Sequence, residues 1–161
     1  MGAFMRKIFV FSFLLGLLLV TGCKNPLFNP KADARIAYFT DTANAQISSL
    51  TLSGAAPHTI RAYVIISNGV DVRFSDYTVD CYTVAGNKIP VTVTGNTSAY
   101  IGGTGTTVST ATGYVGLNIT TAELVTYKTT NSLPQINMII TLNGEDVNAN
   151  PIAITGAFPI Y

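Results

Sequence analysis

Short runs in which apolar and polar residues alternate fill the sequence from Arg35 to its end. This period of two is typical of β-strands with one buried face, and no comparable stretch shows the period of 3.6 residues that indicates an amphipathic helix. Turn residues separate the runs at intervals of about 8 to 12 residues, a spacing typical of β-sandwiches. The pattern therefore favours an all-β fold.

We expect strands near residues 46–53, 59–66, 70–74, 77–84, 89–93, 106–111, 114–120, 135–142 and 152–157. Residues 122–127 could form a further short strand or one helical turn. The predicted fold is an antiparallel β-sandwich of the immunoglobulin-like kind, and a small β-barrel is the alternative. Because the sequence has no tryptophan, the Cys–Trp–Cys signature of true immunoglobulin domains is absent.

Three turn signals connect the expected strands. Asn68-Gly69 predicts a hairpin between its flanking strands, because both residues tolerate the positive φ of a type I′ turn. Residues 85–88 predict a second hairpin, and Asn143-Gly144 with the polar residues after it predicts the last one. Pro90 has no N–H to donate, so its strand should start late or lie at a sheet edge.

The amino terminus has a composition of its own. Arg6 and Lys7 precede an apolar run over residues 8–20 that only Ser12 and Gly16 interrupt. A basic start, an apolar run of this length and small residues at its end predict a secretory signal peptide. The run is shorter than the roughly 20 residues that a transmembrane helix needs.

The run ends in Val20-Thr21-Gly22-Cys23. This ending resembles the lipobox of bacterial lipoproteins, which implies lipid on the Cys23 thiol, cleavage before Cys23 and acylation of the new amino group. Several acyl chains on one cysteine make membrane binding stable, so the resemblance implies a lipid bilayer as a partner. Lys24 in place of aspartate after the cysteine implies the outer membrane.

The sequence is expected to divide into a signal peptide (1–22), a lipidated cysteine with a tether (23–34) and a single β-sandwich domain (35–161). From Cys23 onward the chain has seven basic and eight acidic side chains, a net charge of −1. A net charge near zero gives no electrostatic attraction toward phosphates, so nucleic acid is not an expected partner.

Residues 89–122 contain no charged residue, and ten of these 34 residues are threonine and six are glycine. Natural sheets usually protect their edges with charge, proline or bulges. The region therefore indicates either a well-covered sandwich with a neutral face or a surface that pairs with an envelope protein or with a second copy. A glycosylated or carbohydrate-facing surface is a third interpretation.

Candidate catalytic residues are few, and we expect neither enzyme activity nor a cofactor. Cys81 is the only thiol besides Cys23 and is expected to be buried and inert. His58 is the only histidine and is expected in a solvated turn. Asp71, Asp76 and Asp80 would serve acid–base chemistry only if two of them converged in a cleft.

Residues 145–150 are weak calcium candidates, through the side chains of Glu145, Asp146, Asn148 and Asn150. Oxygen ligands in a polar turn suit a hard cation, but Pro151 stands where an EF-hand needs glycine. The alternative interpretation is a turn whose asparagines bond their own backbone. We therefore predict no dedicated metal site.

These observations favour a membrane-anchored, non-enzymatic structural or protein-interaction module of the cell envelope that can self-associate through residues 89–122. A lipoprotein that binds a glycan or small ligand is the alternative, and it would gain support if Tyr100, Tyr114 and Tyr127 were exposed and clustered. An enzyme ranks third, and a close pair among the three aspartates in a cleft would support it.

Overall fold

A computed structural model describes residues 30–51, 57–102 and 110–161. The chain divides into two compact units, Met1–Lys31 and Ala32–Tyr161, and the fold below is that of the second. The predicted signal peptide and Cys23 lie outside the described residues. Within the described ranges, no helix is both long enough and apolar enough to cross a bilayer.

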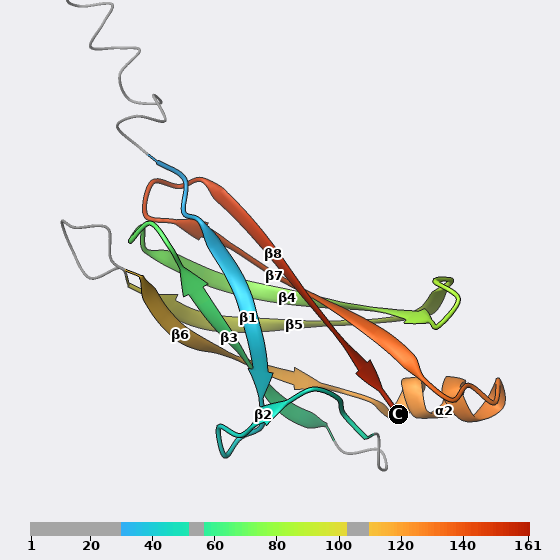
Figure 1. Cartoon of the computed structure of the whole chain (residues 1–161). Helices are drawn as coiled ribbons and strands as arrows, with labels where there is room; N and C mark the ends of the chain where they lie inside the picture. The colour runs from blue at the N-terminus through green and yellow to red at the C-terminus, as the bar shows by residue number, and fades with distance from the viewer. Residues whose placement is uncertain (1–29, 52–56, 103–109) are drawn as a thin grey trace, which may run out of the picture. The chain divides into compact units, whose positions relative to one another are not determined.

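Two antiparallel four-stranded sheets form the second unit (Figure 1). Sheet 1 has the order β2-β1-β3-β6 and sheet 2 the order β5-β4-β7-β8. Their bounds are β1 (Ala34–Thr40), β2 (Gln46–Ile47), β3 (His58–Ile66), β4 (Val72–Thr83), β5 (Lys88–Ile101), β6 (Ala111–Ile119), β7 (Ile136–Asp146) and β8 (Pro151–Ile160), with helix α2 (Ala122–Thr130) between β6 and β7. The sheets stay open, so the predicted sandwich is confirmed and the barrel alternative is wrong.

The strand order is also immunoglobulin-like. If β1, β3 and β6 are named A, B and E, and β4, β5, β7 and β8 are named C, C′, F and G, the sheets read A-B-E and C′-C-F-G. This division of strands is the one that immunoglobulin-type sandwiches share. The short strand β2 extends sheet 1 beyond β1.

Side chains from both sheets meet in one apolar core. In β6 the predicted alternation places Val115, Leu117 and Ile119 inside, and all three are buried. Leu124 of α2 joins the same core, which fixes the helix against the sandwich. Burial of each such side chain stabilises the fold by roughly 1.5–3 kcal/mol, so the core outweighs any single polar contact.

The turn at Asn68-Gly69 exists, but the hairpin predicted there is wrong. Gly69 has the expected positive φ of 66°, yet β3 belongs to sheet 1 and β4 to sheet 2. The turn bonds to the chain before β1 instead: Ser67 N–H donates to the Asp33 carbonyl (2.8 Å), and Asn68 Oδ1 accepts from Asp33 N–H (3.0 Å). The turn residues fix a reversal of the chain and leave open which sheet the next strand joins.

The β4–β5 hairpin is confirmed, with Gly86 at φ 85° in its turn. Pro90 lies on β5, an edge strand, as predicted. Asn143-Gly144 lies inside β7, so the predicted position of the last turn is wrong and the turn falls at residues 147–150. A Cβ on Gly144 would stand 2.1 Å from the Arg73 carbonyl oxygen, so this glycine permits a close approach of β4 and β7.

Three other predicted segments differ from the structure in extent. Of the strand expected at 46–53, the described residues 46–51 form only the two-residue strand β2 and a parallel bridge from Leu50 to Ile160. Residues 122–127, left open between strand and helix, are part of the nine-residue helix α2. The strand expected at 106–111 lies mostly outside the described residues.

Candidate functional site

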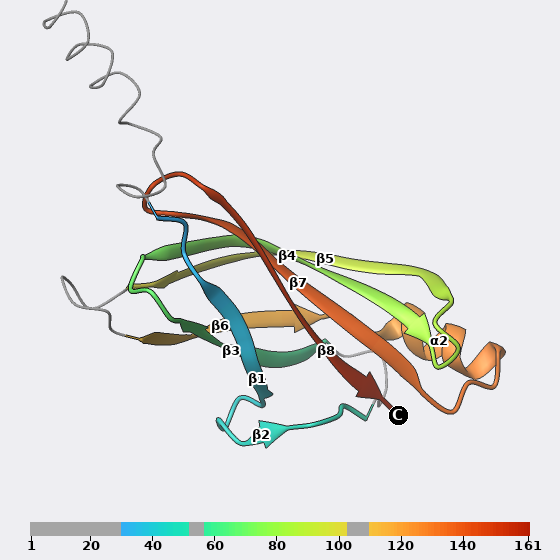
Figure 2. The same ribbon diagram turned by 45° about the horizontal axis from the view of Figure 1, so that its top comes forward.

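The uncharged residues 89–122 build the edge strands on one side of the sandwich. β5 ends sheet 2 and β6 ends sheet 1, and the two strands lie side by side (Figures 1 and 2). We call eight exposed, uncharged side chains of these strands the neutral edge: Thr92, Thr94, Asn96, Ser98 and Tyr100 of β5, and Thr112, Tyr114 and Asn118 of β6. Lys88 and Pro90, at the start of β5, are also exposed but do not belong to it. This edge has none of the charged side chains that usually keep sheet edges from pairing with other chains.

Side chains from sheet 2 cover part of the β6 backbone. The Tyr77 hydroxyl donates to the Asn118 carbonyl (2.6 Å) and accepts from the Asn118 N–H (3.1 Å). Thr97 Oγ1 donates to the Gly116 carbonyl (3.4 Å). β6 is therefore capped from within the sandwich, whereas β5 pairs on one side only, with β4.

Gly95 makes this cap possible. It is the cross-strand partner of Tyr77, and a Cβ at Gly95 would stand 2.3 Å from the tip of the Tyr77 ring. The Tyr77 ring therefore lies over Gly95, where no side chain stands in the way, and its hydroxyl reaches β6. Sequence reasoning missed this contact, because it depends on the register between β4 and β5.

A groove of ≈ 440 Å³ adjoins the neutral edge where β5 meets α2. Pro90 and Val91 line it from β5, and Ala122, Thr126 and Tyr127 line it from the helix. Glu123 is the single charged residue among its lining residues. A mostly apolar groove beside a neutral edge strand can accept apolar side chains of a protein partner.

The structure does not bring Tyr100, Tyr114 and Tyr127 together. They lie on β5, β6 and α2, and no ring contact joins any two of them in the described ranges. The Tyr100 hydroxyl donates to the Asp71 carboxylate, and this hydrogen bond raises the pKa of Tyr100. The clustering that would have favoured the glycan-binding alternative is therefore absent from these three residues.

A different tyrosine row crosses the exposed face of sheet 1. Tyr38, Tyr63 and Tyr114 are in register on β1, β3 and β6. The ring centroids of Tyr38 and Tyr63 lie 4.5 Å apart at 17°, and those of Tyr63 and Tyr114 lie 5.0 Å apart at 58°. Burial and the neighbouring Tyr114 and Tyr63 phenols raise the pKa of Tyr38.

The rings of Tyr38 and Tyr63 stack on one another, whereas those of Tyr63 and Tyr114 are tilted. The row stabilises sheet 1 as a series of cross-strand aromatic pairs. Sequence reasoning missed it, because three residues far apart in the chain become a row only through strand register.

The three candidate aspartates each have their own partner. Hydrogen bonds from Asn143 and Ser75 lower the pKa of Asp76. A hydrogen bond from Lys88, at 2.9 Å, lowers the pKa of Asp80 against the opposing effect of burial. Asp71 accepts from the Tyr100 hydroxyl. A lowered pKa keeps a carboxyl group ionised at neutral pH, the opposite of what a general acid requires.

Cys81 is fully buried, on the inward face of β4 that it shares with Val79 and Tyr77, as predicted. Burial and the nearby Asp80 carboxylate raise the pKa of its thiol to about 12, so the reactive thiolate is scarce at neutral pH. The expectation for His58 is wrong: it is the first residue of β3 and half-buried. Its Nε2 is buried with no hydrogen-bond partner among the described residues.

Asp146 organises the β7–β8 turn through hydrogen bonds from nitrogen donors. Its Oδ1 accepts from the N–H groups of Asn148 and Asn150 (both 2.9 Å), and its Oδ2 accepts from the Ala32 N–H (3.0 Å). Burial opposes ionisation, but these bonds and the Asn150 amide outweigh it and lower the pKa of Asp146. The turn is self-bonded, as in the alternative to calcium, but the side chain that bonds the backbone is that of Asp146 and not those of the asparagines.

The calcium candidates also point to different faces of β7. Asp146 is buried, whereas Glu145 beside it is exposed on the opposite face. Across residues 30–51, 57–102 and 110–161, no group of three or more His, Cys, Asp or Glu is placed to hold a metal ion.

No protein-family model and no curated protein matches this chain. It is similar in structure to the Arabidopsis thaliana protein AT1g01470, at 12% identity and a TM-score of 0.49 over 81% of this chain and 82% of that one. It is similar to a protein from Archaeoglobus fulgidus, at 12% identity and a TM-score of 0.42 over 67% of this chain and 87% of that one. It is also similar to At2g46140.1, described as a late embryogenesis abundant protein, at 14% identity and a TM-score of 0.40 over 96% of this chain and 83% of that one. Likenesses of this degree carry no argument about function.

Proposed function

We propose that this protein is a lipid-anchored lipoprotein of the bacterial cell envelope whose β-sandwich is a non-enzymatic interaction module. Cys23 holds it in a membrane, the outer membrane by the resemblance of its lipobox. The neutral edge binds another envelope protein or a second copy of the chain. One observation carries the interaction: all of β6, and all of β5 except its first residue, Lys88, come from the uncharged run, and these two edge strands lie on the same side of the sandwich.

The surroundings of the neutral edge support this function. β5 pairs with a neighbouring strand on one side only. The groove against α2 begins at Pro90, which has no N–H to donate along this strand. The neutral edge thus combines unpaired backbone groups with a neighbouring apolar groove. A partner that adds a strand uses the backbone groups for hydrogen bonds and the groove for its side chains. The separately bonded aspartates and the buried thiol support a role that involves no catalysis.

The anchor is tested by fractionating cells that express the full chain or its Cys23→Ser variant. The wild type is expected in the membrane fraction and the variant in the soluble fraction, because the acyl chains supply the membrane affinity. The Cys81→Ala variant, which leaves Cys23 intact, is the matched control and should stay in the membrane fraction. Membrane association of Cys23→Ser that persists would reject lipid anchoring.

Self-association is tested by light scattering of the full chain in detergent over a hundredfold range of concentration. If the second copy is the partner, the molar mass rises with concentration and the Thr94→Lys variant abolishes the rise. Thr155→Lys on β8, the opposite edge of sheet 2, should leave it unchanged. A constant monomeric mass removes the second copy from the proposal and leaves another envelope protein as the partner.

A further inference from the structure

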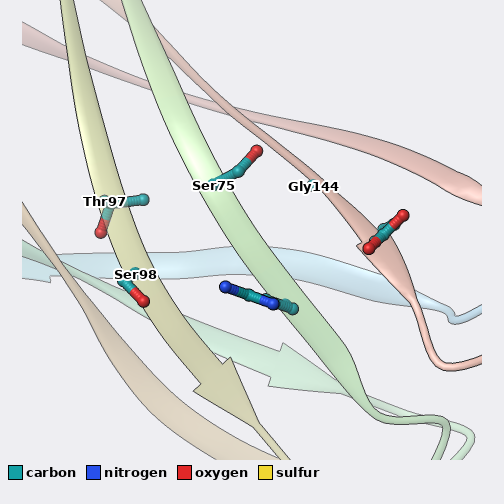
Figure 3. A pocket seen from close by; sticks show the side chains of 6 residues that line it. Ser75, Thr97, Ser98 and Gly144 are labelled. Atoms are coloured by element: carbon teal, nitrogen blue, oxygen red, sulfur yellow. The ribbon is translucent and has the colours of Figure 1, made fainter.

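Ser75 is an extra residue of β4 in its pairing with β7, and two residues of β5 face it on the other side. A hollow of ≈ 470 Å³ lies at this bulge on the exposed face of sheet 2. The pairing of β4 with β5 passes from Phe74–Ala99 directly to Asp76–Asn96. Ser75 on one strand and Thr97 and Ser98 on the other therefore leave the ladder, and all three line the hollow (Figure 3). Bulges of this kind redirect side chains next to binding sites.

Two opposite charges line the same hollow. Arg73 and Glu145 are direct cross-strand partners on β4 and β7, and both are exposed. Such partners have Cβ atoms about 4.5–5.5 Å apart and easily form an ion pair, yet no nitrogen of Arg73 lies within 4.0 Å of a Glu145 carboxylate oxygen. The two side chains line the hollow without an ion pair between them.

The remaining polar groups of the hollow are also available to a ligand. The Ser98 hydroxyl has no hydrogen-bond partner among the described residues. The Ser75 hydroxyl donates to Asp76 Oδ2 (2.8 Å) and keeps lone pairs that can accept. Gly144 contributes a stretch of backbone with no side chain to fill the space (Figure 3).

We propose that this hollow binds a small zwitterionic ligand, a peptide of two or three residues with free ends. Arg73 binds the ligand's carboxylate and Glu145 binds its ammonium group. The guanidinium fork suits a carboxylate, and a purely anionic or cationic ligand would meet one charge of its own sign. The volume lies in the range of about 300–1,000 Å³ that small-molecule sites have.

The neighbouring carboxylates do not disturb this balance. Asp76 accepts from Ser75 and Asn143 and does not line the hollow. Asp71 accepts from the Tyr100 hydroxyl and also lies outside the lining. The site goes beyond the proposed interaction through the neutral edge, and its two charged residues lie outside residues 89–122.

The test is a titration of the isotope-labelled full chain, held in detergent micelles, with trialanine. The backbone amide signals of Ser75, Ser98 and Gly144 are expected to shift and to saturate. Arg73→Gln and Glu145→Gln should each weaken binding at least about tenfold, because each removes a charged hydrogen bond. Arg35→Gln, an exposed arginine on sheet 1, is the matched control and should leave the affinity unchanged.

Capped ligands assign each end of the peptide. N-acetyl-trialanine lacks the ammonium group, so Glu145→Gln should bind it as well as it binds trialanine. Trialanine amide lacks the carboxylate, so Arg73→Gln should not distinguish it from trialanine. Absence of a saturable shift at the three amides, or equal affinity of the wild type for trialanine capped at both ends, would overturn the proposal and leave Arg73 and Glu145 as a surface charge pair.

Discussion

Tyr77 joins the two sheets at the residue scale through a single hydroxyl. The side chain is 3% exposed, and its oxygen serves both backbone groups of Asn118 at the edge of sheet 1. At Asn118, the Tyr77 hydroxyl therefore makes the hydrogen bonds that a further strand beside β6 would make. The contact explains how an edge without charges keeps part of its backbone satisfied.

Replacing Tyr77 with phenylalanine keeps the ring and removes both hydrogen bonds. The Asn118 N–H and carbonyl then lose their partner, so we expect the free energy of unfolding to fall by about 1–3 kcal/mol. Urea denaturation of the two proteins measures this difference. Tyr82→Phe is the control, since no hydrogen bond of the Tyr82 hydroxyl occurs among the described residues, and its effect should stay within about 0.5 kcal/mol. Equal effects of the two substitutions would contradict the role given to Tyr77.

Gly95 and Gly116 provide a matched pair of strand glycines, neither with a positive φ. A Cβ at Gly95 would collide with the Tyr77 ring, whereas a Cβ at Gly116 meets no atom within 4 Å. We expect Gly95→Ala to destabilise the fold by about 1–3 kcal/mol, because the ring must move off Asn118. Gly116→Ala should be neutral or stabilise by up to about 1 kcal/mol. Thermal unfolding of both variants decides the matter, and a tolerated Gly95→Ala would show that the Tyr77 ring is free to shift.

At the scale of elements, Asp146 ties the β7–β8 turn to the start of the domain at Ala32. Its pKa is lowered in the folded state, so the stabilisation that it gives is present above the ordinary pKa of a carboxyl group. As the pH falls through the lowered pKa of Asp146, the carboxylate becomes protonated and this stabilisation is lost.

Asp146→Ala should therefore lower the free energy of unfolding at pH 7 by about 1–3 kcal/mol, since three backbone N–H groups lose their acceptor. The difference in the free energy of unfolding between wild type and variant should become smaller once the pH is below the lowered pKa of Asp146. Urea denaturation at pH 7 and at successively lower pH measures this difference. A difference of constant size at every pH would show that the charge of Asp146 has no part in it.

Sequence patterns predict the strands well because burial on one face leaves a local period of two, as in β6. They leave α2 undecided, since Val125, Thr126 and Thr129 favour strands while burial of Leu124 and charges at the helix ends favour the helix. The crossing of the chain between sheets at Asn68-Gly69 was mispredicted, because turn chemistry is local and sheet membership is not.

The candidate sites divide in the same way. The uncharged run over residues 89–122 and the lipobox-like ending at residues 20–23 are each a continuous stretch of sequence, so composition and residue order reveal them. The Tyr77–Asn118 contact and the hollow at the β4 bulge depend on register between strands distant in sequence. The tyrosine row and the pairing of Arg73 with Glu145 depend on register too. No motif in the sequence marks any of these contacts.

At the scale of the whole sandwich, its two sides are closed in different ways. On the β1–β8 side, Phe39 stacks on Phe158 with ring centroids 5.1 Å apart, and Gly156 leaves room for Phe39 and Ile36. On the β5–β6 side, Tyr77 and Thr97 make the polar contacts, and the exposed residues of the two strands after Lys88 are uncharged. This asymmetry makes the neutral edge, rather than the β8 edge, the side from which we expect binding.

Site-specific photo-crosslinking in cells tests this claim most directly. A photoreactive residue is placed at Thr94 on β5 or, as the matched position, at Thr155 on β8; both are exposed edge positions of sheet 2. We predict a discrete crosslinked adduct from position 94 and none from position 155. An equal yield from both positions, or an adduct from position 155 alone, would contradict the assignment of the neutral edge as the interaction surface.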